Sequence, residues 1–284
     1  MTTTTFPADL ETKNQQLRQI LRGFPRVIIA YSGGVDSAFL LKVAHQELGS
    51  RATGIIGVSP SLMPEEHDAA VELATQIGAN LRVVETHEMD DENYASNPNN
   101  RCYFCKSHLF ETLTRIAQNE GFEAVCDGTN LDDMSEWRPG AQAGIENQVR
   151  SPLREVGLTK NEIRELSKAL GLPTWDKPAM PCLSSRIPYG TPVTIEALRM
   201  IGQSEAWLRS QGLREVRVRH FDESGKLTAR VEVAPEELSG AFSLRQELIR
   251  VLKDIGYNSV LLDLEGYRRG KMNDAISPLI QISL

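Results

Sequence analysis

The sequence predicts an α/β protein with a doubly wound parallel sheet, followed by a smaller C-terminal α+β domain. Over the first half of the chain, apolar β-rich runs alternate with helix-periodic segments, and the connections between them are short. A glycine-containing loop follows the first apolar run and opens directly into a helical pattern. After Pro192 the order changes to helix, strand, strand, helix, strand. We therefore expect two domains, residues 1–190 and residues 191–284.

The elements of the first domain follow from hydrophobic periodicity. A helix over 8–22 carries leucines and an isoleucine on one face. The expected elements then run in the order strand 26–31, helix 36–48, strand 52–59, helix 64–77, strand 81–85, polar segment 90–101, helix 102–118 and strand 124–127. Ligands of such sheets bind at the carboxyl ends of strands, where residues 32–37, 59–63 and 127–133 fall.

The sequence indicates some of the remaining elements more clearly than others. Residues 134–157 show few periodic positions, whereas Thr159, Glu162 and Gly171 mark the two ends of a helix over 159–170. A proline-rich loop follows. The expected elements of the second domain are helix 194–210, strand 214–220, a turn at 222–225, strand 227–233, helix 235–255 and strand 258–264.

Composition limits the class of protein. The chain has 284 residues, enough to bury a substantial core, and a formal net charge of −7. The acidic balance argues against broad nucleic-acid binding. The N-terminal residues Met-Thr-Thr-Thr-Thr-Phe-Pro contain neither a basic patch nor an apolar segment, and no apolar run approaches the length of a membrane span. We expect a cytoplasmic protein without a membrane partner.

The glycine-containing loop carries the main chemical signal. Residues 30–37 read Ala-Tyr-Ser-Gly-Gly-Val-Asp-Ser, and such small residues let backbone N–H groups close round an anion at a helix N-terminus. The spacing is neither the dinucleotide fingerprint nor the Walker loop. Ser-Gly-Gly-Val-Asp-Ser resembles the pyrophosphate loop of the PP-loop ATP pyrophosphatases, which have the adenine nucleotide alpha hydrolase-like fold. These enzymes cut ATP between the α and β phosphates. A plain Gly-Gly turn before a helix is the alternative.

The resemblance implies ATP and Mg²⁺ as cofactors. Asp36 and Lys106 are expected to manage the phosphates and Mg²⁺, with Lys106 acting as a point charge on the departing pyrophosphate. A solvated lysine at a helix start is its alternative role. Asp132 is a candidate Mg²⁺ ligand, or else an acidic loop cap. The expected ATP contacts are Ala30, Ser32, Gly33, Gly34, Val35, Asp36, Ser37, Ser59, Lys106, Gly128 and Thr129.

Four cysteines form a second signal. Cys102 and Cys105 open a predicted helix between cationic neighbours, which favours thiolate over thiol. This spacing suits redox, zinc or iron–sulfur chemistry better than a disulfide framework. Cys182 lies in the proline-rich loop, a poor place for a core cysteine. Cys126 ends an apolar strand, where a small buried hydrophobe is favoured over a fourth metal ligand.

Six motifs occur in one order along the chain. They are Ser32–Ser37, Asn100–Lys106, Asp127–Asp133, Ser151–Leu153, Pro181–Arg186 and Gly266–Asn273. Together they resemble the LarE family of ATP-dependent sulfur transferases, over nearly the whole chain. The resemblance implies adenylation of a carboxylate on a nicotinate-derived pyridinium dicarboxylate mononucleotide, followed by thiocarboxylate formation, in synthesis of the nickel-pincer cofactor of lactate racemase. It also implies a homo-oligomer, with a hexamer as the assembly known in the family.

The family implies two sources of sulfur. One branch carries only the loop cysteine, which matches Cys182 and ends as dehydroalanine after giving up its sulfur. Another branch holds a 4Fe–4S cluster on three cysteines, which match Cys102, Cys105 and Cys182. Three thiolates leave one iron open for a terminal sulfide. We expect the cluster, with sacrificial Cys182 and structural zinc as the alternatives. The sequence does not identify the sulfur donor.

A substrate site is expected in the second domain. Arg217 and Arg219 lie two apart on a predicted strand, so both project from one face. Paired guanidinium groups suit a monophosphate, a use that the family supports. A solvent-facing edge strand is the alternative. The expected substrate-binding residues are Ser185, Arg186, Arg217, Arg219 and Glu205.

Two other functions compete with this prediction. PP-loop proteins with three-cysteine clusters also thiolate tRNA, but a basic face or RNA-binding module would then be expected. A non-catalytic nucleotide and iron–sulfur sensor is a different class of protein. The intact Ser32–Ser37 loop and Lys106 argue against a sensor.

Overall fold

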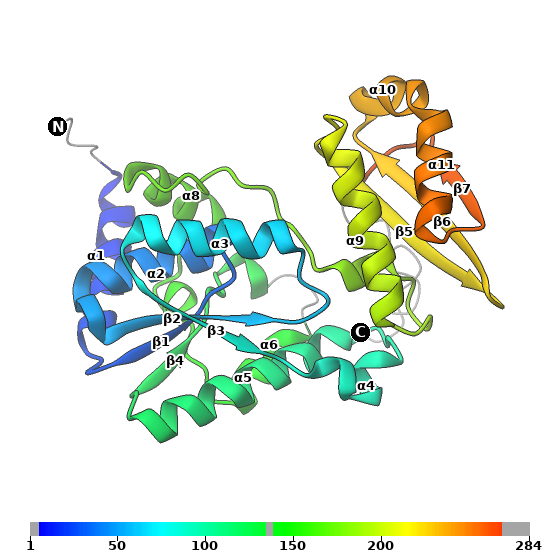
Figure 1. Cartoon of the computed structure of the whole chain (residues 1–284). Coiled ribbons are helices and arrows are strands. Elements are labelled where there is room, and N and C mark those ends of the chain that lie inside the picture. The colour runs from blue at the N-terminus through cyan, green and yellow to red at the C-terminus, as the bar shows by residue number, and fades with distance from the viewer. Residues whose placement is uncertain (1–5, 135–138, 269–284) are drawn as a thin grey trace, which may run out of the picture. The chain divides into compact units, whose positions relative to one another are not determined.

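The computed structural model describes residues 6–134 and 139–268 (Figure 1). The chain divides into two compact units. The first contains the residues up to Glu88 together with Asn100–Met180, and the second contains Met89–Asn99 and the residues from Pro181 onward. The division therefore falls at 180/181 rather than near 190. The short segment Met89–Asn99, which the first unit flanks on both sides in sequence, also belongs to the second unit, and the sequence did not predict this.

A parallel four-stranded sheet with the order β3-β2-β1-β4 forms the centre of the first unit. The chain adds β2 and β3 on one side of β1 and then returns to add β4 on the other, which confirms the predicted doubly wound fold. The strands are β1 (Val27–Ala30), β2 (Ala52–Val58), β3 (Asn80–Glu85) and β4 (Ala124–Cys126). The main helices are α1 (Ala8–Arg22), α2 (Val35–Leu48), α3 (Pro64–Ile77), α5 (Arg101–Glu120) and α8 (Lys160–Ala169).

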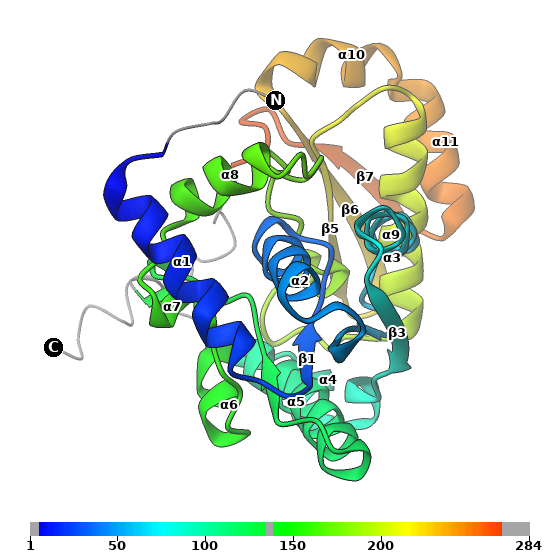
Figure 2. The same cartoon turned by 90° about the vertical axis from the view of Figure 1, so that its left-hand side faces the viewer.

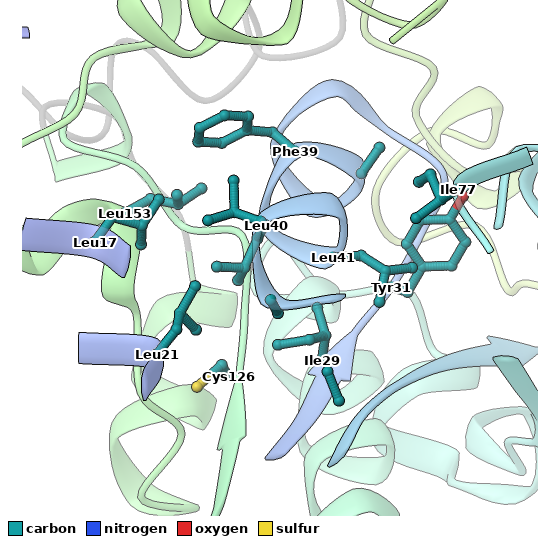
Figure 3. Close-up of a cluster of buried hydrophobic side chains, with 14 of the residues drawn as sticks. Leu17, Leu21, Ile29, Tyr31, Phe39, Leu40, Leu41, Ile77, Cys126 and Leu153 are labelled. Carbon is teal, nitrogen blue, oxygen red and sulfur yellow. The ribbon is translucent and has the colours of Figure 1, made fainter. Parts of the chain in front are cut away.

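Helices cover both faces of this sheet. The side chains of β1 alternate between the two faces, so they pack in two separate core clusters. Val27 and Ile29 pack in the core cluster that also contains residues of α1, α2, α3 and α8. Figure 3 shows part of it, with Leu40 of α2 near Leu17 and Leu21 of α1. On the other face, Ile28 and Ala30 pack with residues of α5 and β4.

The topology places two loops at the same point of the sheet. The strand order reverses between β1 and β4, so the loops leaving their carboxyl ends depart toward opposite faces of the sheet. These are residues 31–34, which lead into α2, and residues 127–131. Figure 2 shows α2 directly after β1. The fold therefore brings together the two loops that the sequence singled out for ATP.

Further short elements complete the first unit. Helices α6 (Gly140–Glu146) and α7 (Pro152–Glu155) occupy the stretch that had few periodic signals. The predicted capping box at the start of α8 is present: the Thr159 side chain accepts a hydrogen bond from the Glu162 N–H, and the Glu162 carboxylate accepts one from the Thr159 N–H. Within the described ranges, no helix is long and apolar enough to cross a membrane.

The second unit contains a mixed three-stranded sheet in the order β5-β6-β7. Strands β5 (Val216–Glu223) and β6 (Lys226–Val233) pair antiparallel through a tight turn at Ser224 and Gly225, both with positive φ. Strand β7 (Ser259–Leu262) pairs parallel to β6. The helices of this unit are α4 (Glu92–Ala95), α9 (Ile195–Ser210), α10 (Leu238–Ser243) and α11 (Arg245–Ile255).

The expectation of one helix over 235–255 is wrong. The segment begins with a 3-10 helix, Pro235–Glu237, and continues as α10 and α11. Leu244 separates the last two because its ψ of 2° lies outside the α-helical range. Apolar residues of α10 and α11 pack in the same core cluster as Val216 and Val218 of β5, so the break does not interrupt the apolar pattern.

Candidate functional site

The loop between β1 and α2 is built around Gly33. Its φ of +69° favours glycine, and a Cβ atom added here would lie 2.5 Å from the Cβ of Ala70 on α3. The Ser32 N–H donates to the Ser37 hydroxyl oxygen at 3.1 Å, and the two hydroxyl oxygens are also 3.1 Å apart. These bonds fold the loop back against the first turn of α2.

The loop after β4 packs against the same helix start. A Cβ atom added to Gly128 would lie 2.9 Å from the backbone nitrogen of Ser37. The buried Asp127 carboxylate fixes this loop by accepting hydrogen bonds from the hydroxyls of Thr129 at 2.6 Å and Ser151 at 2.8 Å. The first N–H groups of α2 have no acceptor within the helix, and the helix dipole is positive here. Together the two loops form a site suited to phosphate.

Two lysines that the sequence analysis missed reach this site. Lys160 Nζ lies 2.5 Å from Asp36 Oδ2, and Lys177 Nζ lies 2.8 Å from Glu66 Oε2 and 3.5 Å from the Gly33 carbonyl oxygen. Lys160 is the first residue of α8, so the capping box locates it on a helix. No local signal relates it to Asp36, which is 124 residues away in sequence.

The other expected ATP contacts lie on several elements of the first unit. Lys106 lies in the second turn of α5 with its Nζ 5.0 Å from the centre of the Phe110 ring, and it forms no hydrogen bond or ion pair with any residue that the structure describes. Its role on pyrophosphate stays a prediction. Ser59 follows β2 and hydrogen-bonds Ser61. Ala30 and Val35 are buried, and Gly34 caps α2.

Asp132 caps a helix in this structure. Its Oδ2 accepts a hydrogen bond from the Lys160 N–H at 2.8 Å, and its own N–H donates to the Asn130 side-chain oxygen at 2.9 Å. The Asn130 side chain in turn lies 3.4 Å from Asp36. Asp132 therefore links the β4 loop to α8, and its use as a Mg²⁺ ligand stays a prediction.

The cysteines divide between the two units. Cys102 lies in the first turn of α5 and Cys105 begins the second, so the two are about one turn apart. Cys102 is exposed and Cys105 is half-buried. Cys182, half-buried, belongs to the second unit and immediately precedes the 3-10 helix Leu183–Arg186. Cys126 packs in the core, where desolvation raises the pKa of its thiol. The described residues contain no group of three or more His, Cys, Asp or Glu side chains arranged to hold a metal ion.

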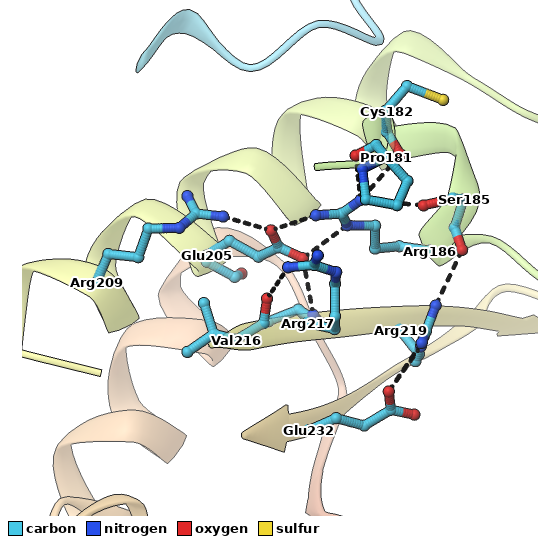
Figure 4. Close-up of polar contacts among 12 residues, drawn as sticks. Pro181, Cys182, Ser185, Arg186, Glu205, Arg209, Val216, Arg217, Arg219 and Glu232 are labelled. Carbon is cyan, nitrogen blue, oxygen red and sulfur yellow. Dashed lines mark hydrogen bonds and ion pairs between the residues drawn. The ribbon is translucent and has the colours of Figure 1, made fainter. Parts of the chain in front are cut away.

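A buried ion pair anchors the loop that carries Cys182 (Figure 4). Arg186 is fully buried and donates to both carboxylate oxygens of Glu205 on α9, at 2.8 and 2.9 Å. Its guanidinium also donates to the Cys182 carbonyl oxygen at 3.0 Å. Burial alone would raise the pKa of Glu205, but Arg186 and the N–H of Val218 hold it below its ordinary value. The Cys182 sulfur points away from this network.

Arg217 and Arg219 lie beside this pair and are about 6% and 5% exposed. The alternative of a solvent-facing strand is therefore wrong. Arg219 binds the Glu232 carboxylate and donates to the Ser185 carbonyl oxygen at 3.0 Å. Burial lowers the pKa of Arg217, and the neighbouring Arg186 cation lowers it further. The structure thus brings together all five expected substrate-binding residues.

Comparison with known proteins identifies the family. No protein-family model matches the sequence. The chain is 47% identical over 270 residues to an uncharacterised protein of Synechocystis, covering 94% of this chain and 99% of that protein. It is 36% identical over 272 residues to the pyridinium-3,5-bisthiocarboxylic acid mononucleotide synthase of Lactiplantibacillus plantarum, covering 95% of this chain and 97% of that enzyme. The chain belongs to the LarE family of sulfur transferases.

This result confirms the LarE resemblance predicted from the order of the motifs. A more distant similarity, 29% identity over 176 residues, relates this LarE-family chain to one of the subunits of the glutamine-hydrolysing GMP synthase of Methanopyrus kandleri. That match covers 58% of this chain and 55% of the GMP synthase subunit. In the motif Gly266–Asn273, residues 269–273 lie outside the described part of the chain.

Proposed function

We propose that this protein is an ATP-dependent sulfur transferase acting on a pyridinium dicarboxylate mononucleotide. It adenylates a carboxylate of that substrate and converts it to a thiocarboxylate, in synthesis of the nickel-pincer cofactor of lactate racemase. The alignment with the Lactiplantibacillus plantarum synthase, over nearly the full length of both chains, carries the proposal. A cytoplasmic location and a homo-oligomeric assembly are parts of the same proposal.

Adenylation is proposed at the N-terminus of α2. The loop at Gly33 and the loop at Gly128 would hold the phosphates with backbone N–H groups, so that a substrate carboxylate oxygen attacks the α-phosphorus as the bond to pyrophosphate breaks. Lys160 and Lys177 supply positive charge beside this loop and would stabilise the departing pyrophosphate. The half-buried carboxylate of Asp36 is a hard oxygen ligand of the kind that Mg²⁺ prefers.

The substrate monophosphate is assigned to the arginine cluster of the second unit. Three buried arginines, at 186, 217 and 219, face two buried glutamates, at 205 and 232. Because burial and the neighbouring cation lower the pKa of Arg217, its charged form is stabilised by an added anion. We assign the phosphate contact to Arg217, supported by Arg219 and Ser185.

For the sulfur step we propose a 4Fe–4S cluster on Cys102, Cys105 and Cys182. The pair on α5 fits two ligands of such a cluster, because both residues lie near the N-terminus of the helix, where the positive dipole favours thiolate. Cys182 directs its sulfur away from the Arg186 network, which fits a third ligand. When bound, the cluster supplies a terminal sulfide as the sulfur nucleophile.

Sacrificial transfer from Cys182 is the competing route. Its sulfur would attack the acyl carbon of the adenylate and displace AMP, forming a thioester. Loss of the Cα proton would then break the Cβ–Sγ bond, leaving dehydroalanine in the chain and the thiocarboxylate as product. A structural zinc ion on the same cysteines is a third possibility, which a metal count distinguishes from iron.

The test combines ATP consumption with product analysis. The full-length protein, purified without oxygen, is incubated with Mg-ATP and pyridinium-3,5-dicarboxylate mononucleotide. We expect AMP and pyrophosphate in equal amounts, and a product in which sulfur replaces one carboxylate oxygen. Failure of the dicarboxylate to stimulate AMP release would overturn the proposal, as would AMP release that depends on tRNA instead.

A further inference from the structure

We propose that Tyr94 and Asn97 are positioning residues for sulfur transfer. They clamp the loop that follows Cys182 onto the chain segment that leads into Cys102 and Cys105. This role rests on the proposed function, because it concerns the step in which those cysteines take part. The clamp is made entirely of residues of the second unit, and neither Tyr94 nor Asn97 is among the residues assigned above to ATP or to the substrate.

The amide of Asn97 is the centre of the clamp. Asn97 is fully buried, and its Nδ2 donates to the carbonyl oxygens of Pro188 and Thr191, both at 2.8 Å, with the Ile187 carbonyl oxygen at 3.4 Å. The backbone carbonyl oxygen of Asn97 accepts a hydrogen bond from the Gly190 N–H at 2.9 Å. One residue therefore binds four positions of the loop.

Tyr94 holds the beginning of the same loop. Its hydroxyl lies 2.6 Å from that of Ser184, and both side chains are buried. Ser184 stands two residues after Cys182, in the 3-10 helix. One residue after Tyr94, the Ala95 carbonyl oxygen accepts the Val193 N–H at 2.8 Å. Bonds from a single short segment thus fix the loop from Ser184 to Val193.

The choice of residue at 97 matches this geometry. Asn97 has a φ of +57°, a conformation that asparagine tolerates better than most residues. Its side chain also carries the two N–H donors that a cluster of carbonyl oxygens requires. Aspartate would accept the same backbone conformation, but it would place a carboxylate against those carbonyls in place of a donor. The substitution therefore removes the clamp and retains the turn.

The clamp is close to the other cysteines along the chain. Cys102 is five positions after Asn97, so the connecting backbone can span at most about 18 Å. Because the loop of Cys182 is bonded to Asn97, the clamp limits how far that loop can move away from Cys102. Residues 89–99 belong to the second unit, and through the clamp they couple the loop of Cys182 to the chain that enters α5.

The test compares Asn97→Asp with Asn99→Asp, which makes the same change at an exposed position two residues on. We expect Asn97→Asp to keep dicarboxylate-dependent ATP–pyrophosphate exchange within about twofold and to lower thiocarboxylate formation roughly tenfold or more. In the full-length, reduced and chelator-treated chain, dibromobimane is expected to cross-link Cys182 to Cys102 or Cys105. Asn97→Asp should lower that yield roughly fivefold. Asn99→Asp should match the unsubstituted protein in all three measurements.

Equal sulfur transfer or equal cross-linking in the two variants would overturn the clamp, as would absence of the cross-link in the unsubstituted protein. Circular dichroism shows whether Asn97→Asp folds. If it does not, Tyr94→Phe, which removes one hydroxyl, decides the matter and should lower transfer and cross-linking in the same direction. A protein that shows no exchange at all contradicts the proposed function, whereas the cross-link comparison still reports on the clamp.

Discussion

At the scale of single residues, the loop between β1 and α2 (residues 31–34, the phosphate loop) requires glycine at position 33. Gly33→Ala meets both a positive φ and the Ala70 side chain, whereas Gly121→Ala meets only the positive φ, with no atom within 4 Å. We expect both variants to lose roughly 1 kcal/mol of stability from the backbone conformation. Only Gly33→Ala should also lose ATP–pyrophosphate exchange, by roughly 100-fold or more. Equal exchange in the two variants would contradict the role of the loop.

Lys160 provides a second test at this scale. Lys160→Met removes the cation that pairs with Asp36, so we expect the rate of ATP–pyrophosphate exchange to fall roughly 100-fold. The ion pair is partly exposed, and its loss should cost less than about 1 kcal/mol of stability in a urea titration. Lys13→Met is the control, because Lys13 pairs with Glu162 on the same helix. A similar loss of exchange in the control would show that α8 is merely disturbed.

Through Glu205, the free energy of unfolding is expected to depend on pH in the acid range. The pKa of this carboxylate is lower in the folded chain than its ordinary value of 4.5, so the ionised group stabilises the fold at neutral pH. That contribution is lost as the pH falls from about 4.5 through the folded-state pKa. Glu205→Gln leaves Arg186 buried without its anion and should cost about 3 kcal/mol at pH 7. The difference from the unsubstituted protein should shrink in acid.

The control for this prediction is Glu196→Gln on the same helix. Glu196 pairs with Arg199 in solvent, and its replacement should leave the pH profile of urea unfolding nearly unchanged. A constant difference between Glu205→Gln and the unsubstituted protein across the acid range would contradict the assignment.

Residue types were easier to predict than their partners. The loop at Gly33 and the arginines at 217 and 219 could be named from local patterns, since small residues and a two-residue period are local features. Burial of the arginines depends on Glu205 and Glu232, which arrive from a helix and another strand. Lys160 was missed for the same reason. Contacts between distant segments leave no trace in hydrophobic periodicity.

At the scale of elements, helix ends carry the most reliable signals. Helix α3 has the predicted bounds Pro64–Ile77; proline begins it and Gly78 follows it with positive φ. The break at Leu244 was missed because apolar residues continue on both sides of it with helical spacing. A backbone interruption that preserves the apolar face cannot be read from the pattern alone.

The capping box of α8 provides a test of whether the stability of this helix affects ATP–pyrophosphate exchange. Thr159→Ala removes a side chain that accepts the Glu162 N–H, and we expect a loss of about 1 kcal/mol in urea unfolding. Thr194→Ala removes the equivalent bond at the start of α9 and should cost a similar amount. Only Thr159→Ala should lower ATP–pyrophosphate exchange, because Lys160 follows it directly. Equal exchange in both variants would exclude this coupling.

At the scale of the whole molecule, the order of strands and helices was sufficient to predict the doubly wound sheet and the α+β second unit. The order of motifs was sufficient to predict the family. The division of the chain was not predictable in the same way, because residues 89–99 join the second unit through the buried bonds of Tyr94 and Asn97. The assignment of this segment to the second unit depends on its tertiary contacts, and the composition of the segment does not indicate it.

The central claim is that sulfur reaches the substrate from a cluster on Cys102, Cys105 and Cys182, after activation at the phosphate loop. The most direct test is the mass of the intact polypeptide after turnover without oxygen, alongside a count of thiocarboxylates per chain. We predict an unchanged polypeptide and more than one product per chain. A chain that has lost one sulfur at Cys182, with no more than one product for each, would contradict the account.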